Sequence, residues 1–392
     1  MTLITEQSEL EDFCGKLAGA DFVTVDTEFM RESTYWPKLC LVQLAGPDSH
    51  AAVDPLAPEL DLQPVYDLMA NQSVLKVFHA ARQDIEIFLH QGKVMPRPVF
   101  DTQIAAMVCG YGESVGYETL VVSLTGRRVD KMSRFTNWAN RPLTPPQLAY
   151  ALADVTHLRD VYMKLRERLD RDGRTAWVEE EDAVLVADGT YDLDPQNAWR
   201  RLRPRTDNPR FLAVLQAVAA WREREAQQRN SPRNWVLRDD TLLDIAAQAP
   251  KTPEALARSR GLPKGFAEGR HGKALLDAIA EGVAVVPADR PKPVVRVDLP
   301  SSLTPVVELL KVLLKMSCDQ HGVAAKLVAN TADLEAIAMD DNADVPALHG
   351  WRREVFGETA LAVKHGRVAL AIKGRGLEVV PVPGADGSGE TA

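Results

Sequence analysis

The segment Phe22–Phe29, with the sequence FVTVDTEF, most constrains what this chain can fold into. Its β-branched and aromatic residues, without Gly or Pro, predict a buried strand. Because side chains alternate along a strand, Asp26 and Glu28 lie on one face, one pleat apart. Adjacent buried carboxylates repel each other, and a hard cation such as Mg²⁺ or Mn²⁺ would relieve that repulsion. A solvated acidic pair at a strand end explains the same motif, so other parts of the chain must decide.

Composition limits the class of protein. The chain has 392 residues, 45% of them hydrophobic, which is enough to bury a large core and predicts two or three domains. The N-terminal residues lack a signal segment, and no apolar run is long enough to cross a bilayer. The four cysteines lack the spacing of a zinc site or a disulfide framework. We therefore expect a cytoplasmic protein without membrane contact.

The distribution of charge is uneven. The net charge of -9 argues, for the chain as a whole, against a nucleic-acid partner. Between residues 200 and 238, however, there are ten arginines and only three acidic residues. A guanidinium group can donate two hydrogen bonds to one phosphate, so this stretch predicts phosphate binding. A solvated helix face with ion pairs to Glu223 and Glu225 is the alternative. The candidates for RNA contact are Arg200, Arg201, Arg203, Arg205, Arg222 and Arg233.

The order of expected elements indicates the fold of the first half. Three strands with short connections predict an antiparallel meander, and alternating strands and helices follow it. A mixed sheet with helices on its faces is the α/β fold that this order favours. Strands are expected at residues 22–29, 39–45, 50–54, 74–78 and 99–100, and helices at 6–20, 62–70, 80–90 and, capped by Asp101, up to 109.

Two later helices add acidic side chains. Asp84 lies in the first turns of the expected helix 80–90, where stabilisation of the helix dipole alone would explain it. A second helix begins at the Pro145-Pro146 pair, and its Tyr150 and Asp154 are four residues apart, on one face. Tyr150 is the only one of seven tyrosines with an Asp at this spacing. A half-buried tyrosine bonded to its own helix neighbour is the alternative.

These positions together resemble a known family. The set Asp26, Glu28, Asp84, Tyr150 and Asp154, on strand, helix and helix, resembles the DEDD exonucleases of the ribonuclease H-like fold, in the subgroup with tyrosine. The motifs YWPKLCLVQL, after the acidic strand, and WANRPL, before Tyr150, are similar to those of ribonuclease D. The resemblance covers residues 1–180. The resemblance implies 3′→5′ hydrolysis of RNA with a free 3′ end to 5′-mononucleotides. It also implies stable-RNA precursors such as tRNA as substrates.

The expected mechanism uses two divalent metal ions, Mg²⁺ or Mn²⁺. Two metals about 4 Å apart can stabilise the attacking and the leaving oxygens of a phosphodiester. Asp26 is the candidate shared ligand, Glu28 and Asp154 would complete the site that activates water, and Asp84 would hold the second metal. A phenol has a pKa of about 10. Tyr150 is therefore expected to orient the water and accept or pass on its proton.

The second half of the chain predicts helical domains. Helices separated by Pro and Gly from residue 211 are similar to an HRDC domain, and a weaker, less basic repeat follows. The expected divisions are an exonuclease domain at 1–190, a linker at 191–209, an HRDC domain at 210–290, a second, degenerate HRDC-like all-α domain at 295–382 and a disordered tail at 383–392. A monomer is expected. A DNA exonuclease of the same fold and a non-catalytic nucleic-acid-binding adaptor stay open as alternatives.

Overall fold

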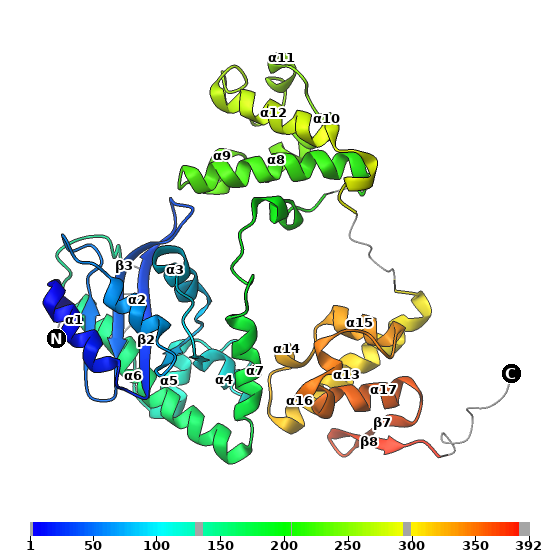
Figure 1. The fold of residues 1–392 in the computed structure, drawn as a ribbon. Helices are drawn as coiled ribbons and strands as arrows, with labels where there is room; N and C mark the ends of the chain where they lie inside the picture. Colours follow the sequence, from blue (N-terminus) through cyan, green and yellow to red (C-terminus); the bar gives the residue numbers. More distant parts are fainter. Residues whose placement is uncertain (1–2, 130–135, 205, 293–298, 384–392) are drawn as a thin grey trace.

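Three bodies make up the computed structural model, which describes residues 3–129, 136–204, 206–292 and 299–383. Figure 1 shows an α/β part with the N-terminus, a helical part above it, and a second helical part at the lower right. Most of the expected tail at 383–392 lies outside the described residues. Across the ranges just given, no helix has the length and apolar character needed to cross a membrane.

A six-stranded mixed sheet forms the centre of the α/β part. The acidic strand β2 pairs antiparallel with β3 on one side and parallel with β5 on the other, so it lies inside the sheet. The expected meander of β2, β3 and β4 is confirmed. The two-residue strand β1, parallel to β4, is too short for its pattern to be recognised. In spatial order the strands are β1 (Leu3–Ile4), β4 (His50–Val53), β3 (Lys38–Ala45), β2 (Phe22–Met30), β5 (Leu75–Phe78) and β6 (Val99–Asp101).

Helices cover both faces of this sheet. Phe78 packs in the core formed with α1, α2 and α3, whereas its neighbour Val77 packs in the core formed with α4, α5 and α6. This alternation is what a strand buried on both faces requires. The helices are α1 (Gln7–Leu17), α2 (Gln63–Ala70), α3 (Arg82–Gly92), α4 (Thr102–Val108), α5 (Tyr117–Thr125), α6 (Pro145–Asp172) and α7 (Thr175–Leu185).

Local capping residues fix where two of these helices begin. The side chain of Asp101 accepts a hydrogen bond from the Gln103 backbone N–H at 2.8 Å, which confirms the expected cap of α4. Thr144 and Gln147 form a reciprocal capping box at the first turn of α6. Such caps satisfy backbone donors that have no partner inside the helix. The caps therefore define the start of α6, whose second and third turns carry Tyr150 and Asp154.

The first helical part packs around the long helix α8. Its core includes Leu215, Leu242 and Ile279 from three helices. Trp199, within the stretch expected to be a linker, is also buried in this core, because the short 3₁₀ helix η1 (Pro195–Arg201) packs on α8. The helices are α8 (Pro209–Gln228), α9 (Arg233–Val236), α10 (Asp239–Gln248), α11 (Pro253–Leu256) and α12 (Arg270–Ala284), followed by the 3₁₀ turn η2 (Pro287–Asp289).

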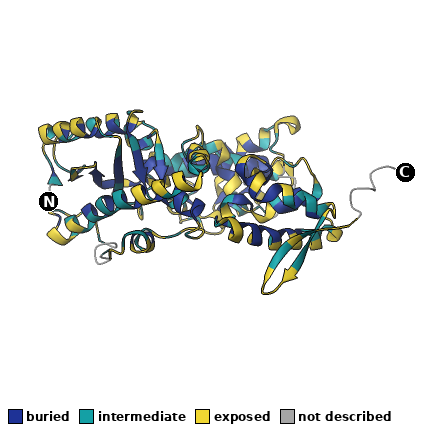
Figure 2. Cartoon of the chain, turned by 90° about the horizontal axis from the view of Figure 1, so that it is seen from below, coloured by how far each residue is buried: buried dark blue, intermediate teal, exposed yellow. Residues whose placement is uncertain are grey.

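The last part is helical but ends in a β-hairpin. The hairpin of β7 (Val368–Lys373) and β8 (Gly376–Pro381) corrects the expectation of an all-α domain up to residue 382. Figure 2 shows the hairpin as intermediate and exposed, whereas the adjacent helix α17 (Glu358–Lys364) contributes the buried residues Ala360 and Val363. The preceding elements are η3 (Ser301–Leu303), α13 (Thr304–His321), α14 (Ala325–Val328), α15 (Thr331–Met339), η4 (Pro346–Leu348), α16 (Gly350–Arg352), the π-helical turn η5 (Arg353–Gly357) and α17 (Glu358–Lys364).

Helix α7 joins this last part to the α/β part. The ring of Trp177 stacks on Trp351 with centroids 4.3 Å apart. Arg352 is buried and forms ion pairs with Glu180 and Glu181 of α7. A stacked aromatic pair beside paired charges is a specific contact, so the two parts have a defined relative position.

Candidate active site

Three of the expected carboxylates meet at one point. Carboxylate oxygens of Asp26, Glu28 and Asp154 all lie within 4.8 Å of one another. Asp26 and Glu28 project from β2, and Asp154 projects from the third turn of α6. Residues that are 126 positions apart in the chain therefore share one site, which the strand and helix patterns alone do not place together.

The alternation of β2 explains why this face carries the acids. Val23 and Val25 point into the core with α1 to α3, which leaves Thr24, Asp26 and Glu28 on the face of α6. The Thr24 hydroxyl donates a 2.8 Å hydrogen bond to the Val155 carbonyl oxygen, one residue from Asp154. This buried bond fixes the strand against the helix at the level of the site.

Asp84 lies beside this group but outside it. It occupies the first turn of α3 and is 8% exposed. The hydroxyl of Thr27 donates a hydrogen bond to its carboxylate. Thr27 points to the opposite face of β2 from Asp26, so Asp84 approaches from the α3 side of the sheet. The four carboxylates therefore lie around residues 26–28 of β2, on both faces of the strand.

Tyr150 projects into the same site. Its side chain is hydrogen-bonded to Asp154, its neighbour on one face of α6. Burial, followed by the charges of Asp154 and Glu28, raises the pKa of the Tyr150 phenol. A protonated hydroxyl is the form that this environment favours, in line with the expected role in orienting water. The ring packs on Trp138 of the WANRPL motif, with centroids 6.1 Å apart.

The electrostatics of the group favour a cation. Burial raises the pKa of Asp26, and burial followed by the charge of Asp26 raises those of Glu28, Asp84 and Asp154. Among the residues that the structure describes, no Lys, Arg or His forms an ion pair with these carboxylates, and Oδ1 of Asp154 is buried without a hydrogen-bond partner. An all-oxygen donor set that lacks a counter-charge fits Mg²⁺ or Mn²⁺.

A cavity of about 500 Å³ is lined by Asp26, Glu28, Tyr150 and Asp154, whereas Asp84 is not part of its lining. Its walls include His79 and Tyr117, neither of which the sequence assigned to the site. The Tyr117 hydroxyl donates a hydrogen bond to the backbone oxygen of Asp154, and its ring lies edge-on to His79. His79 contacts Thr102 through Nδ1 at 3.0 Å. Tyr117 begins α5, and only the packing of α5 on α6 brings it here.

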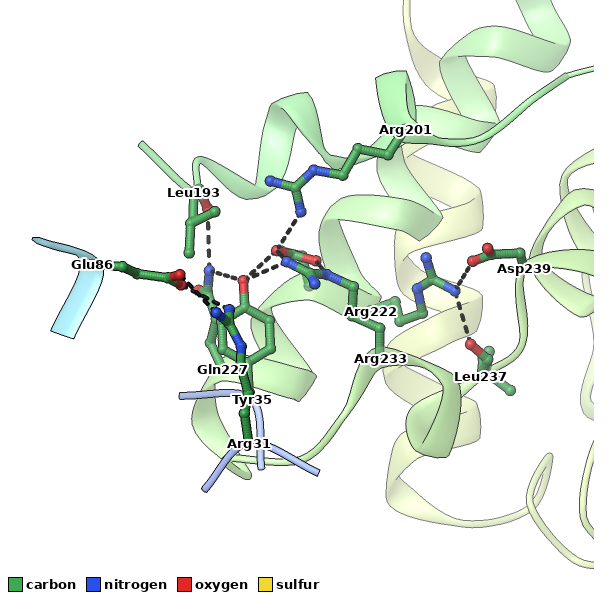
Figure 3. A network of polar contacts seen from close by, with 11 residues as sticks. Arg31, Tyr35, Glu86, Leu193, Arg201, Arg222, Gln227, Arg233, Leu237 and Asp239 are labelled. Carbon is green, nitrogen blue, oxygen red and sulfur yellow. Dashed lines mark hydrogen bonds and ion pairs between the residues drawn. The ribbon is translucent and has the colours of Figure 1, made fainter. Parts of the chain in front are cut away.

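Two of the six expected RNA-binding arginines are engaged inside the protein (Figure 3). The Arg222 side chain is 4% exposed and pairs with Asp239 at 2.6 Å. Arg233 donates 2.6 Å hydrogen bonds to both carboxylate oxygens of Glu223. Arg222 is too buried to meet a phosphate, which corrects that expectation for this residue. Arg233 is one third exposed and pairs with Glu223, and its contact with phosphate stays a prediction.

The other four arginines differ among themselves. Arg200 and Arg203 are exposed. Arg201 is half exposed and lies 3.5 Å from Glu223, a longer contact than that of Arg233. Arg205 lies outside the described residues. Arg210, Arg229 and Arg238, which are not among the six candidates, are exposed as well, and the candidates that are exposed, Arg200, Arg201 and Arg203, lie before α8.

The fold and the site define a class of protein. A mixed sheet that brings an acidic strand against a helix with a Tyr-x-x-x-Asp pair, followed by helical domains, is the arrangement of a DEDD exonuclease. The family model described as 3′-5′ exonuclease matches residues 1–170, and the model described as HRDC domain matches residues 211–279. We use the name HRDC domain below for the part built on α8.

Relatives along the full length narrow this class. The chain is 55% identical over 383 residues to Ribonuclease D from Nitrobacter hamburgensis, which covers 97% of this chain and 99% of the relative. It is 53% identical over 380 residues to Ribonuclease D from Granulibacter bethesdensis, covering 97% and 96%. The crystal structure of Escherichia coli RNase D, an exoribonuclease involved in structured RNA processing, matches with a TM-score of 0.79 and 28% identity over 93% of this chain and 99% of that chain. The chain belongs to the ribonuclease D family, and it is a 3′→5′ exoribonuclease.

Proposed function

We propose that this exoribonuclease removes nucleotides with two divalent metal ions held by Asp26, Glu28, Asp84 and Asp154. The observation that carries the proposal is the group of three carboxylates within 4.8 Å, with Asp84 beside it and no neutralising side chain in the described chain. Bound there, Mg²⁺ or Mn²⁺ would acidify a water molecule and stabilise negative charge on the phosphate oxygens.

The side chains of the protein have separate tasks in this proposal. After burial, the charge of Asp26 is the largest cause that raises the pKa of Glu28, Asp84 and Asp154, which suits a carboxylate that both ions would share. Asp154, held by Thr24 and Tyr117 through the backbone of α6, would offer its unpartnered oxygen to the ion that acidifies water. Tyr150 orients that water through its hydroxyl. Tyr150 also receives or passes on the proton that the water loses.

We propose structured RNA with a free 3′ end, such as a tRNA precursor, as the substrate class. The full-length likeness to an exoribonuclease involved in structured RNA processing supports this class. The exposed arginines Arg200 and Arg203, together with Arg201 and with Arg205 outside the described residues, are the proposed phosphate contacts. A cytoplasmic location is part of the proposal, and the four cysteines, which are all free and buried, suit a reducing compartment. A monomer stays a prediction.

Labelled oligonucleotides test the direction and the sugar preference. RNA and DNA of one sequence, labelled at the 3′ or the 5′ end, are digested with Mg²⁺ or Mn²⁺. The proposal expects immediate release of a labelled 5′-mononucleotide from 3′-labelled RNA and a ladder that shortens stepwise from 5′-labelled RNA. Faster digestion of DNA than of RNA would favour the DNA exonuclease, and no metal-dependent release would favour the adaptor.

A further inference from the structure

The connection from β2 to β3 contacts the HRDC domain. We name residues 31–37 the coupling loop. Tyr35 of this loop is 5% exposed and belongs to the same hydrophobic core as Leu215 and Trp221 of α8. A side chain from the exonuclease domain therefore completes the core of the HRDC domain.

Polar contacts hold Tyr35 in this position (Figure 3). Its hydroxyl donates to Glu223 and accepts from Nη2 of Arg233 at 2.9 Å and from Nε2 of Gln227 at 3.3 Å. The backbone N–H groups of Tyr35 and Trp36 both donate to Oδ1 of Asn230, at 3.1 and 2.9 Å. The HRDC domain thus binds the backbone, the ring and the hydroxyl of this segment, which specifies one orientation of the loop.

The coupling loop also holds the helix that carries Asp84. Arg31 donates two hydrogen bonds to the Glu86 carboxylate, at 2.7 and 2.8 Å. The ring of Trp36 stacks on His90, with centroids 3.7 Å apart. Glu86 and His90 belong to α3, and Glu86 follows Asp84 by two residues. Arg31 follows Glu28 by three residues, so the loop links the two elements that supply the proposed metal ligands.

The charges on the HRDC side of the domain boundary influence which carboxylate Arg31 pairs with. A cavity of about 350 Å³ is lined by Arg31 from the loop and by Arg201, Arg222 and Arg233 from the HRDC side. The carboxylates on that side, Glu223 and Asp239, are already paired with Arg233 and Arg222. Positive charge opposite Arg31 repels it, so the pair with Glu86 is the favourable alternative. Docking of the HRDC domain therefore favours the link from the loop to α3.

We propose that docking of the HRDC domain on the coupling loop sets the spacing between β2 and α3, and that Tyr35 is a positioning residue for the metal site. The HRDC domain then acts on the reaction through Asp84, in addition to any contact with RNA. This inference rests on the metal ligands of the proposed function. A domain that served only to capture RNA would leave metal affinity independent of Tyr35.

The test measures Mn²⁺ binding to the full-length protein by calorimetry, without RNA, and kcat and KM on a dinucleotide too short to reach the HRDC domain. Tyr35→Ala should weaken binding of the weaker Mn²⁺ ion by about tenfold or more, the range found for groups that support metal ligands. It should lower kcat on the dinucleotide more than it changes KM. Tyr35→Phe, which keeps the ring but loses the hydroxyl, should fall between Tyr35→Ala and the wild type.

A matched control separates positioning from HRDC stability. Thr252→Ala removes the side-chain cap of α11 inside the HRDC domain, which has no part in the cavity beside Arg31, and it should leave Mn²⁺ affinity unchanged. If Tyr35→Ala fails to fold, Glu86→Gln is the substitute, because it disrupts the pair between Arg31 and Glu86 that joins the loop to α3. It should weaken the binding of the same Mn²⁺ ion. Unchanged Mn²⁺ affinity and dinucleotide kcat in a folded Tyr35→Ala or Glu86→Gln variant would overturn the proposal. Failure of the wild type to bind Mn²⁺ would instead overturn the proposed function.

Discussion

At the residue scale, the environment of Tyr150 restricts the role that its hydroxyl can have in hydrolysis. Burial, followed by the carboxylates of Asp154 and Glu28, raises the pKa of its phenol, which disfavours a phenolate as general base. Its hydrogen bond to Asp154 aims the hydroxyl at the carboxylate group. These two observations leave orientation of water and passage of its proton as the function of this hydroxyl.

Replacement of Tyr150 by Phe removes the hydroxyl and keeps the ring on Trp138. We expect the hydrolytic rate to fall by about 10²- to 10⁴-fold, the usual effect of losing a positioned proton-transfer group. Mn²⁺ affinity should stay close to that of the wild type, because the four carboxylates remain. Single-turnover hydrolysis and calorimetry measure the two quantities. Loss of Mn²⁺ binding would show that Tyr150 is a structural support of the site.

The carboxylate group also predicts how the stability of the metal-free protein depends on pH. Burial raises the folded-state pKa of Asp154 to about 8 and raises those of Asp26 and Glu28. The folded state therefore binds more protons than the unfolded state above pH about 4, so the free energy of unfolding should decrease as the pH rises from about 4 to 8.

Unfolding in EDTA at pH 5.5 and pH 8 measures this effect. Asp26→Asn should be more stable than the wild type at pH 8, and its advantage should shrink at pH 5.5, where the wild-type carboxyl groups are largely protonated. Mn²⁺ should stabilise the wild type more at pH 8 than at pH 5.5, because binding requires deprotonated ligands. The same free energy of unfolding for the metal-free wild type at pH 5.5 and at pH 8 would contradict the raised pKa values.

At the element scale, the sequence correctly predicted the features that depend on interactions between residues close together in the chain. The alternation of β2, the meander and the Asp101 cap depend on neighbours within a few residues, and all were confirmed. The final hairpin was missed, although a Gly-Arg-Gly turn between two apolar runs favours one. Thr27 and Tyr117 were missed for another reason. Their partners, Asp84 and Asp154, are brought to them by packing between elements, which no spacing along the chain encodes.

The capping box of α6 allows a test at this scale. Thr144→Ala should lower the free energy of unfolding by about 1 kcal/mol, the usual cost of losing an N-cap side chain. Gln147→Glu keeps a side chain that can accept from the Thr144 backbone and should leave stability nearly unchanged. Urea denaturation of both variants measures the difference. Equal stability of Thr144→Ala and the wild type would mean that packing alone fixes the start of α6.

At the scale of the whole molecule, contacts between domains assign roles that residue types alone did not. Arginine richness predicted phosphate binding, yet Arg222 and Arg233 stabilise the HRDC domain and its contact with Tyr35. The sequence motif that begins at Tyr35 supported the family resemblance, but it did not indicate that the tyrosine ring packs in another domain. Such roles depend on surfaces that come together only in the folded chain, and a single sequence carries little record of them.

The exposed arginines before α8 predict a salt dependence. Each phosphate contact on single-stranded RNA contributes about 0.7 to the slope of log affinity against log salt. Replacing Arg200, Arg201 and Arg203 together with Gln should therefore reduce the slope for long RNA by up to about 2. Arg375→Gln, in the exposed turn of the final hairpin, is the control and should leave the slope unchanged. An unchanged slope in the triple variant would assign these arginines to folding or domain packing.

The central claim is that the four carboxylates form a binding site for two metal ions. Calorimetric titration of Mn²⁺ into wild-type and Asp26→Asn protein, with hydrolysis measured on the same samples, tests it most directly. The wild type should bind two ions per chain. Asp26→Asn should bind at most one of them tightly and lose hydrolysis by orders of magnitude while still binding RNA, because the lost carboxylate holds both ions. Two tightly bound ions and full hydrolysis in Asp26→Asn would contradict the claim.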